Sequence, residues 1–201
     1  MNFLAHIYLS QDIDDVIIGN FIADNIRGKR YQNYAIGVQK GILLHRQIDS
    51  YTDSHATVRK STKRLHENYG HYSGVIVDIL YDHFLAKNWN DYSNVDLELY
   101  TSRFYDLMMS NYDDLPERTQ NMLPYMISGN WLFNYAKIEG IQDVLNGMNR
   151  RTKFKSNMNL ATRELIKDYS EFESEFTSFF NELIGFSKTT LEQLHHQFDH
   201  E

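Results

Sequence analysis

The stretch VDILYDHFLAKNW, residues 77–89, has the apolar character of a core helix, yet it contains Asp78, Asp82 and His83. Residues four positions apart lie on one face of an α-helix, so Asp78 and Asp82 are expected to project together. Buried carboxylates take up protons or destabilise the fold unless a counter-cation is present. The stretch therefore predicts a core helix that also forms one wall of a functional site.

The rest of the chain has the same helical character. Apolar residues recur at helical rather than alternating spacing through most of the sequence. The two prolines and ten scattered glycines do not provide the frequent turns that an all-β chain of 201 residues needs. We therefore predict an all-α fold, a single-domain helical bundle over residues 1–201. The expected helices cover residues 2–9, 13–27, 33–52, 55–68, 72–89, 95–110, 116–128, 130–148 and 160–196.

The composition argues against several classes of function. The chain has no cysteine, so any metal has to be held by His, Asp and Glu, and a reducing compartment suits it. The net charge of -7 argues against general nucleic-acid binding, which needs clustered Lys and Arg. No apolar run approaches the roughly 20 residues of a membrane span, and the first residues lack the basic region of a secretory signal. We expect a cytoplasmic protein that binds neither nucleic acid nor membrane.

Two further apolar segments, FIADNIRG and GILLHRQIDSYTDSH, also carry acidic or histidine side chains at helical spacing. The residues concerned are Asp24, His45, Asp49, Asp53 and His55. Imidazole and carboxylate groups on one helical face suit cations such as Mn, Fe or Mg, and facing helices of a bundle commonly supply such ligands. His83 lies about 100° round its helix from Asp82, near the edge of the same face. The three segments together predict a shared metal site.

A structural interpretation of these residues stands beside the functional one. Any one of them alone is more often a core residue satisfied by a hydrogen bond or an ion pair. Arg27 with Asp24, and Arg46 with Asp49, have the spacing of ordinary helix-surface ion pairs. In a metal site the same guanidinium groups would suit bidentate binding of phosphate oxygens. The repetition of the pattern in three segments favours the metal site.

Five short motifs occur together between the first residue and about Arg151: MNFLAHIYLS, GNFIADNIRG, GILLHRQIDSYTDSH, GVIVDILYDHFLAKNW and VLNGMNRR. In this combination the chain resembles the acyl carrier protein phosphodiesterase family of bacteria. That family is described as a divergent, rearranged relative of the HD phosphohydrolases, all-helical and metal-dependent, most often with manganese. The resemblance implies hydrolysis of the phosphodiester at the serine of holo-acyl carrier protein, which releases 4'-phosphopantetheine and the apo carrier. It also implies a divalent ion, Mn in the first place, with Mg or Fe as alternatives.

The resemblance further implies a role for each candidate residue. The implied metal ligands are Asp24, His45, Asp49, Asp82 and His83. Asp78 and His6 are implied to orient these ligands or to replace one of them. The implied phosphate-binding residues are Arg27 and Arg46, whereas Asp53 and His55 act as general acid-base groups or close the end of their helix.

One feature departs from the wider superfamily. No His is followed directly by Asp in this sequence, and the adjacent pair is the reverse, Asp82 and then His83. The order of the ligands and the number of metal ions therefore stay open. So does the question of whether His83 contacts the metal or the substrate.

The implied partner is an acidic carrier protein, which an acidic enzyme has to recognise through a local positive patch. The expected exposed loop NGMNRRTKFKSNMN, from Asn146, supplies Arg150, Arg151, Lys153 and Lys155. The alternative for this patch is a solvated basic loop. Two other functions remain for the whole chain: an HD-type phosphohydrolase of nucleotides or other small phosphodiesters, and a non-enzymatic helical binding protein.

Overall fold

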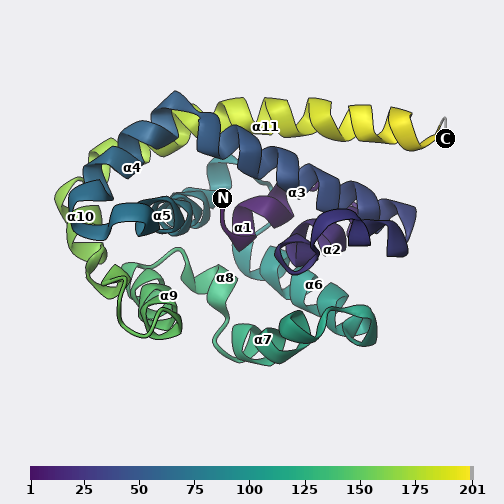
Figure 1. Cartoon of the computed structure of the whole chain (residues 1–201), viewed down its shortest axis with the longest axis horizontal. Helices are drawn as coiled ribbons and strands as arrows, with labels where there is room; N and C mark the ends of the chain where they lie inside the picture. Colours follow the sequence, from purple (N-terminus) through teal and green to yellow (C-terminus); the bar gives the residue numbers. More distant parts are fainter. Residues whose placement is uncertain (200–201) are drawn as a thin grey trace.

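The computed structural model describes residues 1–199, and every element in this part of the chain is a helix, as Figure 1 shows. The prediction of an all-α fold is confirmed. The α-helices are α1 (Phe3–Tyr8), α2 (Asp14–Ile22), α3 (Ile36–Ser54), α4 (Ala56–Tyr69), α5 (Ser73–Lys87), α6 (Leu97–Ser110), α7 (Glu117–Ser128), α8 (Trp131–Asn134), α9 (Ile138–Arg151), α10 (Thr162–Lys167) and α11 (Tyr169–Asp199). Short 3-10 helices join several of them. No helix within residues 1–199 has both the length and the hydrophobicity to cross a membrane.

Helix α5 contains most of the stretch that opened the sequence analysis, and it lies in the core. It packs against α1, α4, α9 and α11. Val77, Leu80, Tyr81, Phe84 and Leu85 are all completely buried, because neighbouring helices cover α5 on several sides. In Figure 1, α3, α4 and α11 run along one side of the molecule, and α7 and α9 lie on the opposite side, with α1 between them.

Helices α2 and α3 approach each other closely through two glycines. A Cβ atom at Gly19 would collide with the backbone carbonyl of Val38, and one at Gly41 would collide with that of Val16. Only a residue without a side chain allows the two backbones to lie this close. The approach matters for the site, because Asn20 follows Gly19 on α2 and faces His45 on α3.

Three expected helices have different ends in the structure. The one expected over 13–27 ends at Ile22 and continues only as a 3-10 turn over Ala23–Asn25, whose short polar residues favour local turns over helix. The one expected over 130–148 breaks between α8 and α9, where His83 Nδ1 donates to the carbonyl oxygen of Tyr135 at 2.8 Å. The one expected over 160–196 breaks at Asp168, between α10 and α11.

A buried ion pair joins α4 to α11. Arg64 binds Glu175 with two hydrogen bonds, Nη1 to Oε2 at 2.7 Å and Nη2 to Oε1 at 2.9 Å. Ser61 Oγ also donates to Glu175, at 2.5 Å, and Lys60 Nζ lies 3.2 Å from its other oxygen. The side chain of Glu175 is only 5% exposed. The pair therefore fixes the start of the long C-terminal helix against α4.

We expect Glu175→Ala to lower the free energy of unfolding by about 3 kcal/mol, at the lower end for a broken buried pair, because Arg64 keeps only its longer contact with Asp168, at 3.9 Å. Burial raises the pKa of Glu175, but its hydrogen bonds to Arg64 and Ser61 outweigh this effect and lower the pKa overall. A folded-state pKa below the unfolded one means that this stabilisation is present at neutral pH and is lost on acidification. Urea unfolding at pH 7 and pH 4 measures both effects. Glu192→Ala, on the exposed face of α11, is the control and should change little.

Candidate active site

Three side chains from α1 and α3 form a compact cluster: His6, His45 and Asp49. Their potential ligand atoms all lie within 4.8 Å of one another. Asp49 Oδ1 lies 3.3 Å from His6 Nε2, and Asp49 Oδ2 lies 3.1 Å from His45 Nε2. The two imidazole rings are stacked, with their centroids 3.9 Å apart. The structure thus brings the His45 and Asp49 pair of the sequence analysis together with His6.

A single residue, Asn20, orients both imidazoles through its side-chain amide and its backbone carbonyl. Its side-chain nitrogen donates to the carbonyl oxygen of His6 at 2.9 Å and to Ser10 Oγ at 3.0 Å, so its oxygen faces the rings. His6 Nδ1 donates to that oxygen at 2.8 Å, and His45 Nδ1 donates to the backbone carbonyl of Asn20 at 2.8 Å. With Nδ1 protonated in both residues, the two Nε2 atoms face Asp49 and are available as ligands.

The charges in the cluster are strongly coupled. Burial lowers the pKa of His6 to about 4, and the positive charge of His45 adds to this effect. Burial also acts against a charge on His45, but interactions with Asp24 and Asp49 raise its pKa to about 9. Burial raises the pKa of Asp49, but the two imidazoles outweigh this and lower it overall. The imidazole of His45 is therefore protonated and that of His6 is neutral, and a metal ion bound at His45 would displace its proton.

The donor set fits a divalent cation. The Nε2 atoms of His6 and His45 are buried and make no well-aligned hydrogen bond within the described part of the chain. Buried polar atoms are rarely left in this state without a partner. Ligands held about 2.1 Å from one ion lie about 3 Å apart, which matches the separations of these nitrogens from the oxygens of Asp49. Imidazole nitrogens suit transition-metal ions such as Fe, and the carboxylate also suits Mn and Mg.

Asp24 approaches the same cluster from the solvent side. It lies in the 3-10 turn after α2, and its Oδ1 is 3.4 Å from His45 Nε2. Interaction with His45 lowers the pKa of Asp24, so its carboxylate is ionised. Its side chain is 73% exposed, and it lines the cleft described below. Asp24 is thus placed to complete a ligand set with one side open to solvent.

Asp78 lies beside the cluster and is connected to it through the backbone nitrogen of Met1. That nitrogen is 3.1 Å from Asp78 Oδ1 and 3.7 Å from Asp49 Oδ1. Burial raises the pKa of Asp78, against the opposing effect of the neighbouring ammonium. Asp78 is therefore in a position to tune the charge of Asp49, one contact away from the ligand atoms.

Asp82 has a different environment, at the start of α1. Its two carboxylate oxygens accept the backbone N–H groups of Leu4, at 2.8 Å, and Ala5, at 3.1 Å. These groups have no partner within α1, because the first N–H groups of a helix never do. The side chain is completely buried. Asp82 thus fixes the beginning of the helix that carries His6, and the structure does not place it among the clustered ligand atoms.

His83 also lies apart from the cluster. Its Nδ1 donates to the carbonyl oxygen of Tyr135 at 2.8 Å, and its Nε2 lies 2.8 Å from the hydroxyl of Tyr169. Both ring nitrogens therefore have protein partners. Burial lowers the pKa of His83, so the ring is neutral and accepts the tyrosine proton at Nε2. These contacts join α5 to the α8–α9 connection and to α11.

The two arginines of the sequence analysis lie on the exposed edge of the site. Arg46 Nη2 donates to the carbonyl oxygens of Ile26, at 3.0 Å, and Gly28, at 2.8 Å, and its guanidinium lies over the ring of Tyr31. These contacts hold the loop after α2 against α3. Arg27 is exposed in that loop. Neither residue lines the cleft that contains His6, His45 and Asp24.

Asp53 lies one turn after Asp49 near the end of α3, where its charge acts on Asp78, and His55 directly follows the helix. Neither belongs to the cluster of His6, His45 and Asp49. His55 Nδ1 accepts the backbone N–H of Thr57 at 3.3 Å, so it caps the start of α4. Its Nε2 lies 3.3 Å from Glu182 Oε2 on α11. Asp53 is exposed. The contacts of His55 favour the second of its two roles, the closing of a helix end, whereas the role of Asp53 stays a prediction.

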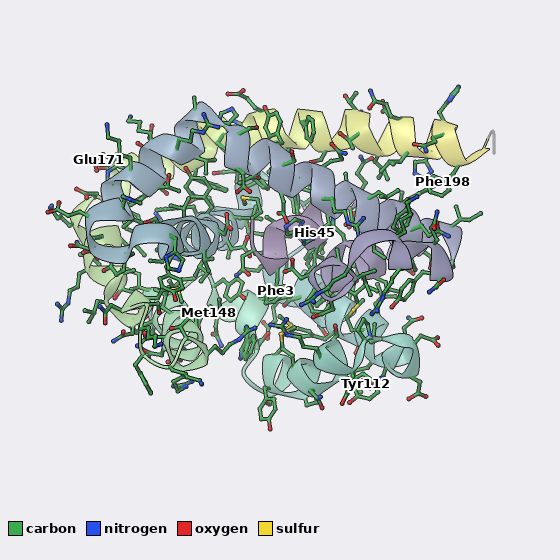
Figure 2. The ribbon with its side chains drawn as sticks, in the orientation of Figure 1. Phe3, His45, Tyr112, Met148, Glu171 and Phe198 are labelled. Atoms are coloured by element: carbon green, nitrogen blue, oxygen red, sulfur yellow. The ribbon has the colours of Figure 1, made fainter. Side chains whose placement is uncertain are left out.

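A cleft of about 1030 Å³ opens from the cluster toward α7 and α9. The buried His6 and His45 line it together with the exposed Asp24, and apolar side chains such as Phe3 and Met148 form much of its wall. Figure 2 shows His45 near the centre of the molecule, with Phe3 below it and Met148 on α9 to the lower left. The cleft is far larger than a phosphate group. It can hold an extended substrate whose reactive end meets the cluster.

The comparisons with known proteins identify the family. The family model described as acyl carrier protein phosphodiesterase matches residues 1–183. The chain belongs to the acyl carrier protein phosphodiesterase family. A curated relative of this name from Pectobacterium atrosepticum is 31% identical over 190 residues, which cover 94% of this chain and 98% of the relative. Another, from Yersinia pestis, is 35% identical over 155 residues, with 76% and 80% covered. No solved structure matches the chain significantly.

Two functional candidates in this member of the acyl carrier protein phosphodiesterase family, Arg118 and Asn20, were missed by the sequence analysis. Arg118, on the first turn of α7, lines the cleft together with Arg151, the last residue of α9. Burial lowers the pKa of Arg151, and the charge of nearby Arg118 adds to this effect. No signal in the sequence marked Arg118. Asn20 carried a signal, because it is a polar residue in the apolar run VIIGNFI, as Asp82 is in its own helix.

The basic segment of this phosphodiesterase-family chain is partly helical, which corrects the expected loop from Asn146. Helix α9 continues to Arg151, and the loop begins at Thr152. Arg150, Arg151, Lys153 and Lys155 are all exposed. The two arginines also line the cleft. The basic residues thus form one rim of the site.

Proposed function

We propose that this chain is a metal-dependent phosphodiesterase that releases 4'-phosphopantetheine from the serine of holo-acyl carrier protein. The observation that carries the proposal is the pair of buried imidazole nitrogens, which face a carboxylate at the inner end of an extended cleft in a member of this family. A catalytic metal site needs such convergent ligands together with an open side for substrate. The long cleft suits an elongated phosphodiester better than a small one.

His6, His45 and Asp49 would hold the ion, with Asp24 on the open side. The expected metal is Mn, with Fe as the nearest alternative and Mg less suited to two imidazoles. When bound, the ion supplies the positive charge that lowers the pKa of a water molecule and neutralises phosphoryl oxygens. Asn20 keeps both imidazoles in the tautomer that leaves Nε2 free, so the ligand set is oriented before the ion binds.

Arg118 and Arg151 would bind the phosphodiester group, in place of Arg27 and Arg46. Both line the cleft, and the ion pairs found within residues 1–199 include neither of them. The charge of Arg118 acts on the guanidinium of Arg151, so the two groups bring two positive charges near each other in the cleft. A phosphodiester anion relieves this repulsion and accepts several hydrogen bonds from the planar groups. The remaining wall of the cleft, largely apolar, would hold the pantetheine arm.

The proposal predicts that the purified protein with Mn converts holo-carrier to apo-carrier, seen by mass spectrometry as the loss of one phosphopantetheine group. Removal of metal with a chelator should abolish turnover, and added Mn should restore it. Metal-loaded, folded protein that leaves holo-carrier intact would contradict the proposal. Preferential turnover of a panel of nucleotides would instead support a general phosphohydrolase. Purified protein that binds no divalent ion would support the non-enzymatic alternative.

A further inference from the structure

Helix α9 ends in a hydrogen-bonding pattern that usually requires glycine. The N–H of Lys153 donates to the carbonyl oxygen of Arg150 at 2.9 Å, and the N–H of Phe154 donates to that of Asn149 at 2.9 Å. These two bonds define a Schellman motif, whose residue after the cap takes the left-handed conformation and is most often glycine. In this chain that residue is Lys153, with φ 53°, and Phe154 follows with φ 62°. Two successive residues with side chains therefore occupy a region that disfavours them.

Side-chain hydrogen bonds fix this strained turn in place. Thr152 Oγ1 donates to Ser156 Oγ at 2.8 Å, and Ser156 Oγ donates to Asn149 Oδ1 at 3.0 Å. The amide nitrogen of Asn149 then donates to Asn159 Oδ1 at 2.7 Å. The loop is thus held by its own network on both sides of Phe154. Backbone strain that surrounding contacts maintain is found preferentially at functional sites.

The strain holds Phe154 in an exposed position. In a Schellman motif the residue at this place usually packs against the last turn of its helix, but the Phe154 side chain is 68% exposed. Exposed aromatic side chains on a fixed backbone are typical anchors of protein interfaces, because little conformational entropy is lost when they are buried. Phe154 gives no apparent packing benefit to the free protein.

Four cationic residues flank Phe154 along the chain, and all four are exposed: Arg150, Arg151, Lys153 and Lys155. The ion pairs found in the described part of the chain include none of them. On a chain with a net charge of -7, they form a local surface of the opposite sign. Such a surface attracts an acidic partner and orients it during approach. Because Arg150 and Arg151 also line the cleft, a partner bound here lies at the entrance to the metal cluster.

We propose that residues 150–155 form a docking patch in which Phe154 is the apolar anchor for an acidic protein surface. Given the proposed function, that surface belongs to the acyl carrier protein, and the cations around Phe154 align it so that its phosphopantetheine arm enters the cleft. An anionic membrane has the same charge and also takes up aromatic side chains. The protein partner is favoured because the patch is continuous with a cleft that takes one extended substrate.

The test compares Phe154→Gly and Phe154→Ala with the wild type. Both variants should raise the KM for holo-carrier about tenfold, as expected for the loss of an interface anchor, and leave kcat little changed. Turnover of bis(p-nitrophenyl) phosphate, which has no protein surface, should be unaffected. Phe154→Gly should also raise the melting temperature, because glycine tolerates φ 62° without strain. If Phe154 instead stabilised the fold, Phe154→Gly would lower the melting temperature. Leu99→Ala, an exposed apolar residue on α6, is the control.

Binding and turnover have to be separated. Anisotropy of labelled holo-carrier, measured with the metal-free protein, reports docking without catalysis, and Phe154→Ala should weaken it by a similar factor. Unchanged affinity and unchanged KM in Phe154→Ala would overturn the docking patch while the proposed function stands. Carrier that binds through Phe154 but is never hydrolysed would support the docking patch and contradict the proposed function. Loss of binding to phosphatidylglycerol vesicles in Phe154→Ala, with carrier affinity unchanged, would assign the patch to membranes and overturn the proposal.

Discussion

Replacement of His45 by alanine is expected to remove bound metal and to lower kcat/KM for holo-carrier by about 10³-fold, or ~4 kcal/mol of transition-state stabilisation. His45 Nε2 lies 3.1 Å from Asp49 and 3.4 Å from Asp24, so it is the one imidazole that contacts both carboxylates. Without it the two carboxylates face each other with no group between them. The measurements are metal content by mass spectrometry and steady-state turnover with saturating Mn.

Two further histidines make this test specific. His66→Ala removes an exposed imidazole from α4 and should change neither metal content nor turnover. His83→Gln tests the ligand role that the family resemblance implied for His83, because the structure places this residue between Tyr135 and Tyr169. We expect the His83 variant to retain its metal. Metal retained in His45→Ala and lost in His83→Gln would reverse the assignment.

The fold and two of the three cluster residues could be predicted from the sequence because both depend on local spacing. The helical period fixes which residues share a face, so His45 and Asp49 were paired correctly in space from their separation alone. The face of α3 is apolar on both sides of them, which directs the pair inward. The same local argument identified α5 as a core helix.

The positions of the remaining site residues depend on which helices pack together, and the spacing of residues along the chain does not determine that. Asp82 lies on the face of α5 that meets the beginning of α1, so it binds backbone N–H groups there. His6 enters the cluster because α1 lies against α2 and presents that residue to Asn20. Arg118 reaches the cleft from α7, far along the chain. Helical spacing shows which residues share a face of a helix, but it does not show which helices pack against each other. Many arrangements of the helices bury the same apolar residues.

Asp82→Ala is expected to destabilise the protein by about 2–5 kcal/mol and to reduce metal affinity without removing a ligand. The change leaves the N–H groups of Leu4 and Ala5 buried and without partners, and each such group costs about 1–3 kcal/mol. His6 follows Ala5 directly, so a displaced start of α1 moves its Nε2 away from Asp49. Urea unfolding gives the stability, and titration with Mn gives the affinity. Ser102→Ala, an exposed change on α6, is the control.

The pH dependence of stability separates this anchoring role from a role as metal ligand. Burial raises the pKa of Asp82 from 3.8 to about 7, although the two N–H groups act in the opposite direction. Between these values the folded state binds a proton that the unfolded state has released, so this residue's contribution to the unfolding free energy falls as pH rises from about 4 to about 7. Asp82→Asn cannot ionise and retains one acceptor oxygen. Without metal, the unfolding free energy of this variant should therefore no longer fall between about pH 4 and pH 7 on account of residue 82. The variant should still bind Mn. An unchanged slope together with a complete loss of Mn would show that Asp82 is a ligand after all, and that α1 starts without its help.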